Sequence, residues 1–116
     1  MLHTHSVAAG LDYIGVNPIL VHLWDQNRVR FEAVTDDQVT EALKMAMRTE
    51  GVIPALESSH GFAQAIFEAE SMSKDDVILI NMSGRGDKDI FTIADALDDD
   101  HWKEFIRQKA EEYGQS

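Results

Sequence analysis

Apolar residues in the middle of the chain follow a helical period between a clear start signal and a clear stop signal. Thr35 can cap a helix, Gln38 stands at the spacing of a capping box, and Gly51 supplies the stop. The apolar positions between these signals fall on one helical face. They are Val39, Ala42, Leu43, Ala46 and Met47. The pattern therefore predicts an amphipathic helix between Thr35 and Gly51.

Three further stretches are also predicted to be helical. In "ALESSHGFAQAIFEAESM", Ser58 or Ser59 is the candidate cap. The apolar face of this helix would comprise Phe62, Ala63, Ile66, Phe67 and Ala69. The next helix would carry Ile90, Ile93, Ala94 and Leu97. The last would be capped by the "DDD" of residues 98–100, turn Trp102, Phe105 and Ile106 inward, and end at Gly114.

Two other stretches predict β-strands. Residues 28–35, "RVRFEAVT", alternate apolar and polar positions. Residues 77–82, "VILINM", are apolar at consecutive positions, which is typical of a strand covered on both faces. The first 28 residues carry closely spaced turn signals in "AAGLDYIGVNP" and predict an ordered loop or series of turns.

The predicted order is loop, strand, helix, helix, strand, helix, helix. Two strands joined through helices must be parallel if they share a sheet, and a buried parallel pair needs neighbours on both sides. The expected fold class is therefore α/β, a partial three-layer sandwich in which a short parallel sheet is flanked by helices. Along the chain we expect a loop-rich segment over 1–28, an α/β core over 29–97 and a helical extension over 98–116.

Composition narrows the range of partners. The 116 residues include 10 Lys and Arg against 21 Asp and Glu, a formal net charge of -11. Such a charge repels nucleic acids and anionic membranes, so neither is expected as a partner. The chain has no cysteine, which excludes disulfides and thiolate metal sites. No apolar run approaches the roughly 20 residues of a membrane span, and the N-terminus does not resemble a signal peptide. These features predict a cytoplasmic protein.

The loop "SGRGDKD", residues 83–89, is the first candidate for chemistry. It follows the second predicted strand, where open α/β sheets gather their ligands. Ser83 offers a hydroxyl, and the glycines let the backbone approach a ligand closely. The glycine spacing is not that of a Walker loop or a dinucleotide fingerprint. A ligand contact and a structural turn therefore both stay open for this loop.

The carboxylate of Glu57 is the second candidate. It stands at a predicted helix start, where a carboxylate also serves as a dipole partner or cap. A role in binding and a role in capping both remain open on position alone. The histidines show no metal-ligand spacing, so the sequence argues against a metal enzyme.

Three stretches together resemble the C-terminal part of the tryptophan synthase β chain family. They are "HSVAAGLDYIGV" (5–16), "RTEGVIPALESSHG" (48–61) and "NMSGRGDKDIFT" (81–92). The resemblance extends from about His5 to Leu97, and the combination of the second and third motifs at this separation is specific. It implies part of a fold-type II pyridoxal-phosphate enzyme domain, acting in tryptophan biosynthesis. The complete family member makes L-tryptophan from L-serine and indole, as a lyase, with an α chain as partner.

The resemblance also implies roles for particular residues. The Ser83 hydroxyl would hydrogen-bond the pyridine nitrogen of pyridoxal phosphate, with Glu57, Gly10 and Gly84 beside the cofactor. A hydroxyl is too weak an acid to protonate that nitrogen, which favours β-replacement over transamination. Asp12 would match the residue that pairs with a mobile domain on closure. The backbone carbonyls of Leu11 and Tyr13 would lie at the family's monovalent cation site.

The chain also departs from the family pattern around that cation site. Ala8, Ile14, Asn17 and Leu20 stand where the family usually has serine, proline, glycine and histidine, which changes the turn chemistry of the loop. The Schiff-base lysine, the catalytic glutamate and the glycine-rich phosphate cup have no counterpart in this sequence. None of its five lysines has a matching context: Lys44, Lys74, Lys88, Lys103 and Lys109. No residue of this chain is therefore assigned as catalytic, and we expect it alone to bind no cofactor.

Two functional interpretations remain open from the sequence. In the first, the chain is a segment of a tryptophan synthase β chain-like protein, active only within a complete chain or with a complementing fragment. In the second, it is a free-standing domain derived from that family and reused for binding or assembly without catalysis. A complementing chain is expected in the first case. In the second, unpaired strand edges invite pairing, so a homo-oligomer is expected, in which two copies cover each other's edges as a dimer.

Overall fold

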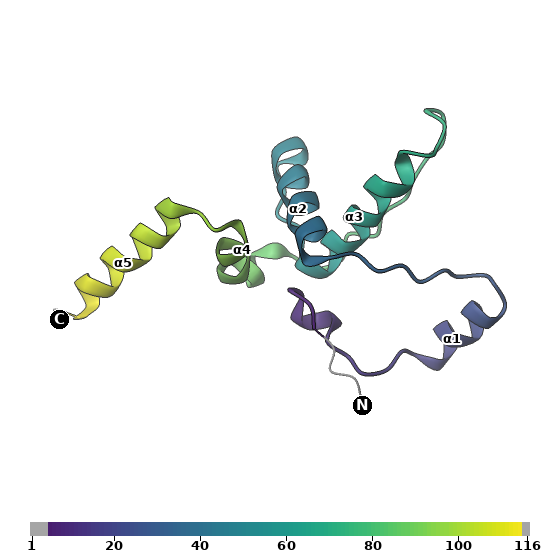
Figure 1. The fold of residues 1–116 in the computed structure, drawn as a ribbon, viewed down its shortest axis with the longest axis horizontal. Helices are drawn as coiled ribbons and strands as arrows, with labels where there is room; N and C mark the ends of the chain where they lie inside the picture. The colour runs from purple at the N-terminus through teal and green to yellow at the C-terminus, as the bar shows by residue number, and fades with distance from the viewer. Residues whose placement is uncertain (1–4, 115–116) are drawn as a thin grey trace.

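A computed structural model describes residues 5–114 of the chain as a set of helices joined by extended segments (Figure 1). Residues 1–4 and 115–116, the outer ends of the first and last expected segments, lie outside the described residues. The elements in chain order are η1 (Ala9–Leu11), α1 (Pro18–Asp25), α2 (Asp36–Glu50), α3 (Leu56–Ala69), η2 (Gly86–Asp89), α4 (Ile90–Leu97) and α5 (Asp100–Gly114).

Helix α2 confirms the helix expected between Thr35 and Gly51. The Thr35 hydroxyl accepts a hydrogen bond from the Gln38 N–H, and the Gln38 side chain accepts one from the Thr35 N–H, which completes the capping box. At the other end Gly51 adopts a left-handed conformation with φ of 67°. Helix α2 packs on α3, and the two stand side by side in Figure 1.

The core of the molecule is small and centres on α2. Its buried cluster comprises Ala8, Val39, Leu43, Leu56 and Ile93. The radius of gyration is 17.7 Å, whereas a compact domain of this length has about 13 Å. The extents of 62 × 41 × 20 Å show the same departure from a sphere. Much of the chain therefore lies away from the α2–α3 pair.

The expected α/β fold with a short parallel sheet is wrong for this structure. No β-strand or sheet occurs in residues 5–114. Residues 28–35 form an extended connection between α1 and α2, and residues 77–82 run back along α3 without a partner strand (Figure 1). The side chains of Val77 and Leu79 are 87% and 95% exposed. An apolar run becomes a buried strand only when other segments cover it and complete its hydrogen bonds, and no part of the described chain does so here.

The first 28 residues contain a helix where turns were expected. The Asn17 side chain accepts a hydrogen bond from the Ile19 N–H over 2.8 Å, and Pro18 occupies the first position of α1. Proline at this position is favoured because its missing N–H would have no intrahelical partner there. The Asn-Pro pair is therefore a helix start in this chain.

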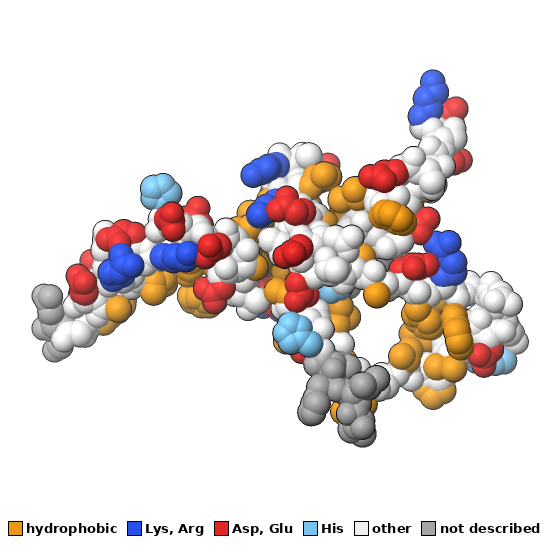
Figure 2. All heavy atoms as spheres, in the orientation of Figure 1, with side chains coloured by type: hydrophobic (Ala, Val, Ile, Leu, Met, Phe, Trp, Pro, Cys, Tyr) orange, Lys and Arg blue, Asp and Glu red, His pale blue; other side chains and the backbone are white. Residues whose placement is uncertain are grey.

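Helices α1 and α5 both leave apolar side chains exposed. In α5, Phe105 and Ile106 are 47% and 42% exposed, so the expectation that they turn inward is wrong. The Trp102 ring lies 6.0 Å from Phe91 of α4 and 5.7 Å from Phe105, between ring centroids. Figure 2 shows apolar side chains gathered along one edge of α5 and around α1. Within the described residues no helix is long and apolar enough to cross a membrane.

Candidate functional site

The loop that carries Ser83 lies antiparallel to the segment that leads into α3. The N–H of Gly86 donates to the carbonyl of Ile53 over 2.9 Å. Three residues earlier in the loop, the carbonyl of Ser83 accepts a hydrogen bond from the Ser58 hydroxyl over 2.7 Å. Contacts with residues far earlier in the chain therefore fix the path of the loop at both ends.

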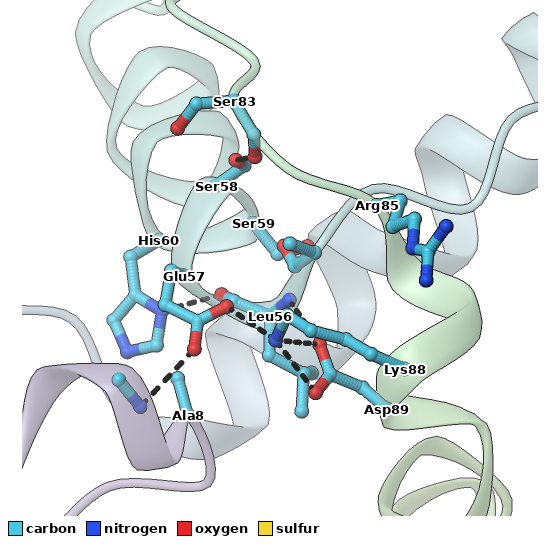
Figure 3. A network of polar contacts seen from close by, with 12 residues as sticks. Ala8, Leu56, Glu57, Ser58, Ser59, His60, Ser83, Arg85, Lys88 and Asp89 are labelled. Carbon is cyan, nitrogen blue, oxygen red and sulfur yellow. Dashed lines mark hydrogen bonds and ion pairs between the residues drawn. The ribbon is translucent and has the colours of Figure 1, made fainter.

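The Ser83 side chain is free to meet a ligand. Ser83 is exposed, and its hydroxyl has no hydrogen-bond partner among the described residues. Figure 3 shows the Ser83 carbonyl directed at Ser58 and the other oxygen of Ser83 pointing away from Ser58. The next residue, Gly84, has φ of 78°, a conformation that favours glycine. The loop thus presents one neutral hydroxyl group outward from a held backbone.

Glu57 joins three segments that are distant in sequence. Its Oε1 accepts a hydrogen bond from the N–H of Gly10 over 3.1 Å, and its Oε2 lies 3.0 Å from Nζ of Lys88 (Figure 3). A Cβ added at Gly10 would meet the carboxylate, so Glu57 could keep this position only beside a residue without a side chain and would otherwise have to turn aside. Glu57 therefore attaches η1 and η2 to the first turn of α3.

Asp89 caps α3 from outside the helix. The residue at the cap position, Ala55, offers no side-chain hydrogen bond, so the first helical N–H groups need another acceptor. Oδ2 of Asp89 accepts from the N–H of Leu56 over 3.2 Å and also lies 2.7 Å from Nζ of Lys88. The expected caps Ser58 and Ser59 instead lie inside α3 and are buried. The start of α3 is thus set by a residue 33 positions later.

The polar contacts hold Glu57 ionised. Its own backbone N–H is the largest cause that lowers the pKa of Glu57 below its ordinary value of 4.5, with Lys88 and the Gly10 N–H adding to it. Partial burial of the carboxylate acts in the opposite direction. Hydrogen bonds to Asp89 and then to Glu57 raise the pKa of Lys88. Both groups are charged at neutral pH.

The attachment of Gly10 to Glu57 should weaken in acid. Because the pKa of Glu57 is lowered in the folded chain, its contribution to stability is present above 4.5 and is lost as the pH falls through the lowered pKa. The amide resonance of Gly10, followed by NMR from pH 7 to pH 3, is expected to shift with this titration. In Glu57→Gln, which keeps the shape and the acceptor oxygen, the shift should disappear. An unchanged titration in Glu57→Gln would contradict the assignment.

The structure brings some of the predicted site residues together and leaves others apart. Gly10 contacts Glu57 directly, and Ser83 and Gly84 lie on the loop held against the start of α3. Asp12, Leu11 and Tyr13 form an exposed stretch at and after η1. Their expected roles in domain closure and cation binding stay predictions. The described residues contain no group of three or more His, Asp or Glu that could hold a metal ion.

Sequence reasoning missed three residues that position this site, namely Ser58, Lys88 and Asp89. Ser58 and Asp89 act on the backbone of segments 25 and 33 residues away, and Lys88 acts on a carboxylate 31 residues away. The spacing of residues along the sequence does not reveal such contacts. The only signal in the sequence was their location in the two motifs "ALESSHG" and "SGRGDKD".

The arrangement suits a heteroaromatic nitrogen better than an anion. A neutral hydroxyl can donate to or accept from a ring nitrogen. The two cations of the loop are already paired, Arg85 with Asp87 at 3.1 Å and Lys88 with Glu57 and Asp89. A phosphate group would therefore compete with carboxylates for both of them. The exposed Ser83 hydroxyl fits the ring nitrogen of a cofactor such as pyridoxal phosphate, whereas a phosphate at either loop cation would have to replace a carboxylate partner.

Comparison with known proteins gives the family. No family model matches the chain. It is 48% identical over 111 residues to the tryptophan synthase beta chain of Helicobacter hepaticus, a match that covers 96% of this chain and 26% of that relative. It is 52% identical over 92 residues to the tryptophan synthase beta chain of Bordetella parapertussis, which covers 79% of this chain and 23% of the relative.

Both relatives are tryptophan synthase chains, so these matches place the chain in the class of tryptophan synthase sequences. Within that class, the chain belongs to the tryptophan synthase beta chain family and corresponds to its C-terminal part. The family resemblance expected from the three motifs is confirmed. The chain spans about a quarter of the length of the curated relatives it matches.

Proposed function

We propose that this chain supplies one wall of the pyridoxal phosphate site of a tryptophan synthase β-type enzyme. The observation that carries the proposal is the Ser83 hydroxyl, which is exposed and has no hydrogen-bond partner within residues 5–114, on a loop held against the start of α3. Pyridoxal phosphate supplies an electron sink for chemistry at a substrate carbon when it is bound. The part of Ser83 would be to orient the ring through its nitrogen without protonating it.

The same contacts limit what the chain does by itself. A single neutral hydrogen bond contributes about 1 kcal/mol net, whereas micromolar affinity needs about 8 kcal/mol. Arg85 and Lys88 are paired with carboxylates, and a phosphate would have to displace those partners. We therefore propose that cofactor binding and the formation of L-tryptophan from L-serine and indole require the rest of a β-type chain. An α chain would then be the partner of that complete assembly in the cytoplasm.

Other residues predicted from the family resemblance would shape the site. Glu57 and Gly10 would support its wall through their mutual hydrogen bond, and Gly84 would let the backbone come close to the ring. Asp12 would contact a mobile domain on closure. The carbonyls of Leu11 and Tyr13 would serve a monovalent cation.

One observation favours the second interpretation, a binding or assembly module. The side chains of Val77 and Leu79 are almost fully exposed, and such apolar surface marks a site of interaction. We propose that another copy of the chain covers this surface in that role; a complementing β-type fragment would cover it in the first interpretation. Catalysis is not needed for this role.

Titration with pyridoxal phosphate tests the proposal. The chain alone, and the chain mixed with the remaining part of the Helicobacter hepaticus beta chain, would be titrated and followed by absorbance. We expect binding only in the mixture, weakened on the order of fivefold in Ser83→Ala because one net hydrogen bond is lost. Ser71→Ala, which removes an exposed hydroxyl beyond the other end of α3, should bind as the unsubstituted chain does.

Two results would count against the proposal. Micromolar binding by the chain alone would show that the limit set by its paired cations is wrong. Binding in the mixture that is equal in Ser83→Ala and Ser71→Ala would remove Ser83 from the site. Sedimentation of the same samples separates the two interpretations, because a stable homo-oligomer that does not combine with the added fragment favours the assembly module.

A further inference from the structure

Two adjacent serines in α3 use their hydroxyl groups in different ways. Both side chains are buried, with exposed fractions of 6% for Ser58 and 0% for Ser59. The Ser59 hydroxyl donates to the carbonyl of Ala55, four residues earlier in the same helix, over 3.1 Å. This is the ordinary local hydrogen bond of a serine inside a helix. Ser59 therefore satisfies its own hydroxyl without reaching another segment.

The Ser58 hydroxyl makes no such local bond. It donates over 2.7 Å to the carbonyl of Ser83, 25 residues away, and so holds the backbone of the residue that presents the free hydroxyl (Figure 3). A buried hydroxyl without an acceptor is destabilising, because it has lost its hydrogen bonds to water. The bond from Ser58 to the Ser83 carbonyl is therefore favoured as long as Ser58 stays buried. The bond fixes the plane of the peptide between Ser83 and Gly84.

The other contacts of the loop lie further along it. Gly86 is bonded to Ile53, and Asp89 accepts from Leu56. In the described residues, Ser58 is the source of the side-chain hydrogen bond at Ser83 itself. Without it, the loop would be held from Gly86 onward, and residues 83–85 could turn about Gly84, whose φ is 78°.

We infer that Ser58 is the positioning residue for Ser83: it holds the Ser83 carbonyl so that the Ser83 hydroxyl faces outward. The link to pyridoxal phosphate rests on the proposed function, whereas the placement of Ser83 by Ser58 does not depend on it. Ser58 itself touches no ligand in this inference and acts through the backbone of the loop.

Backbone ¹⁵N relaxation of the complete 116-residue chain, measured by NMR, tests the inference without any cofactor. The matched variants are Ser58→Ala and Ser59→Ala, which remove the same atom from neighbouring buried sites. We expect the order parameters of residues 83–85 to fall in Ser58→Ala, from the rigid value of about 0.85 toward values below about 0.6, and to stay unchanged in Ser59→Ala. Equal order parameters of residues 83–85 in both variants would overturn the inference.

If Ser58→Ala does not fold, a second pair of variants tests whether the Ser58 hydroxyl holds the loop. Ser58→Thr and Ser58→Val have nearly the same shape and differ in the hydroxyl, so any strain from the added methyl group is shared. Higher order parameters of residues 83–85 in the Thr variant than in the Val variant support the inference, and equal order parameters overturn it.

Titration of pyridoxal phosphate into the mixture with the remaining β chain separates the two proposals. If the unsubstituted mixture binds no cofactor, the proposed function fails while the relaxation result still decides the role of Ser58. If it binds, Ser58→Ala should weaken binding about as much as Ser83→Ala does, and Ser59→Ala should leave it unchanged. Unweakened binding in Ser58→Ala would overturn the link between Ser58 and the cofactor.

Discussion

Replacing Gly86 by alanine is expected to lower the free energy of unfolding by about 3 kcal/mol, the upper part of the range for overpacking. A Cβ added at this position would lie 2.5 Å from the carbonyl oxygen of Pro54 and 2.6 Å from that of Ile53. Real Cβ atoms do not approach backbone oxygens so closely, and backbone atoms cannot turn aside as a flexible side chain can. The loop 83–89 would have to leave the segment before α3, breaking the bond from Gly86 to Ile53.

Chemical denaturation followed by circular dichroism measures this change, with Gly61→Ala as the matched control. Gly61 lies inside α3, and a Cβ there would meet its nearest atom, Cγ2 of Ile80, at an ordinary 3.7 Å. Because alanine favours a helix over glycine, Gly61→Ala is expected to stabilise the chain by about 0.5–1 kcal/mol. If Gly86→Ala had the same free energy of unfolding as Gly61→Ala, the close contact of Gly86 with Ile53 and Pro54 would be contradicted.

The second large effect is expected in the core. Leu43→Ala should lower the free energy of unfolding by about 3 kcal/mol, because it removes buried methyl groups and leaves a cavity. Leu43 is 0% exposed and lies in the cluster with Val39, Leu56 and Ile93, which joins α2 to α3 and α4. Since this core has few members, its neighbours cannot replace the lost contacts.

Met45→Ala is the control for the core substitution. Met45 lies on the same helix and is 50% exposed, so its truncation should change the free energy of unfolding by less than about 1 kcal/mol. Both variants keep helix propensity high, which leaves burial as the main difference between them. Equal effects of the two substitutions in denaturation would show that α2 does not use the Leu43 face for packing.

Local sequence was a sound guide to the helices and to the family. The ends of α2 follow from Thr35, Gln38 and Gly51, because the capping hydrogen bonds and the left-handed stop involve residues only a few positions apart. Helices α4 and α5 were also predicted, from apolar spacing and from the aspartates before α5. The three quoted motifs led to the family that the relatives confirm.

The features that the sequence did not predict depend on contacts between residues far apart in the sequence, or on residue types that suit two different structures. Helix α1 was missed because Asn17 and Pro18 are turn residues as well as helix-start residues. The start of α3 was misplaced because Ser58 and Ser59 fit a cap by type, while the acceptor used is Asp89. The two predicted strands are absent because a β-strand forms only beside a partner strand that completes its hydrogen bonds. An apolar pattern does not show whether such a partner exists.

By itself, then, the sequence determined where helices are stable and to which family the chain belongs, since both follow from short-range spacing and residue identity. Only the tertiary structure decided that residues 77–82 gain no partner strand among the described residues, that Glu57 joins Gly10 to Lys88, and that Ser58 holds Ser83. The physical reason is the same in each case. Burial and hydrogen bonding are completed by groups far away in the sequence, and their presence is fixed only when the chain has folded.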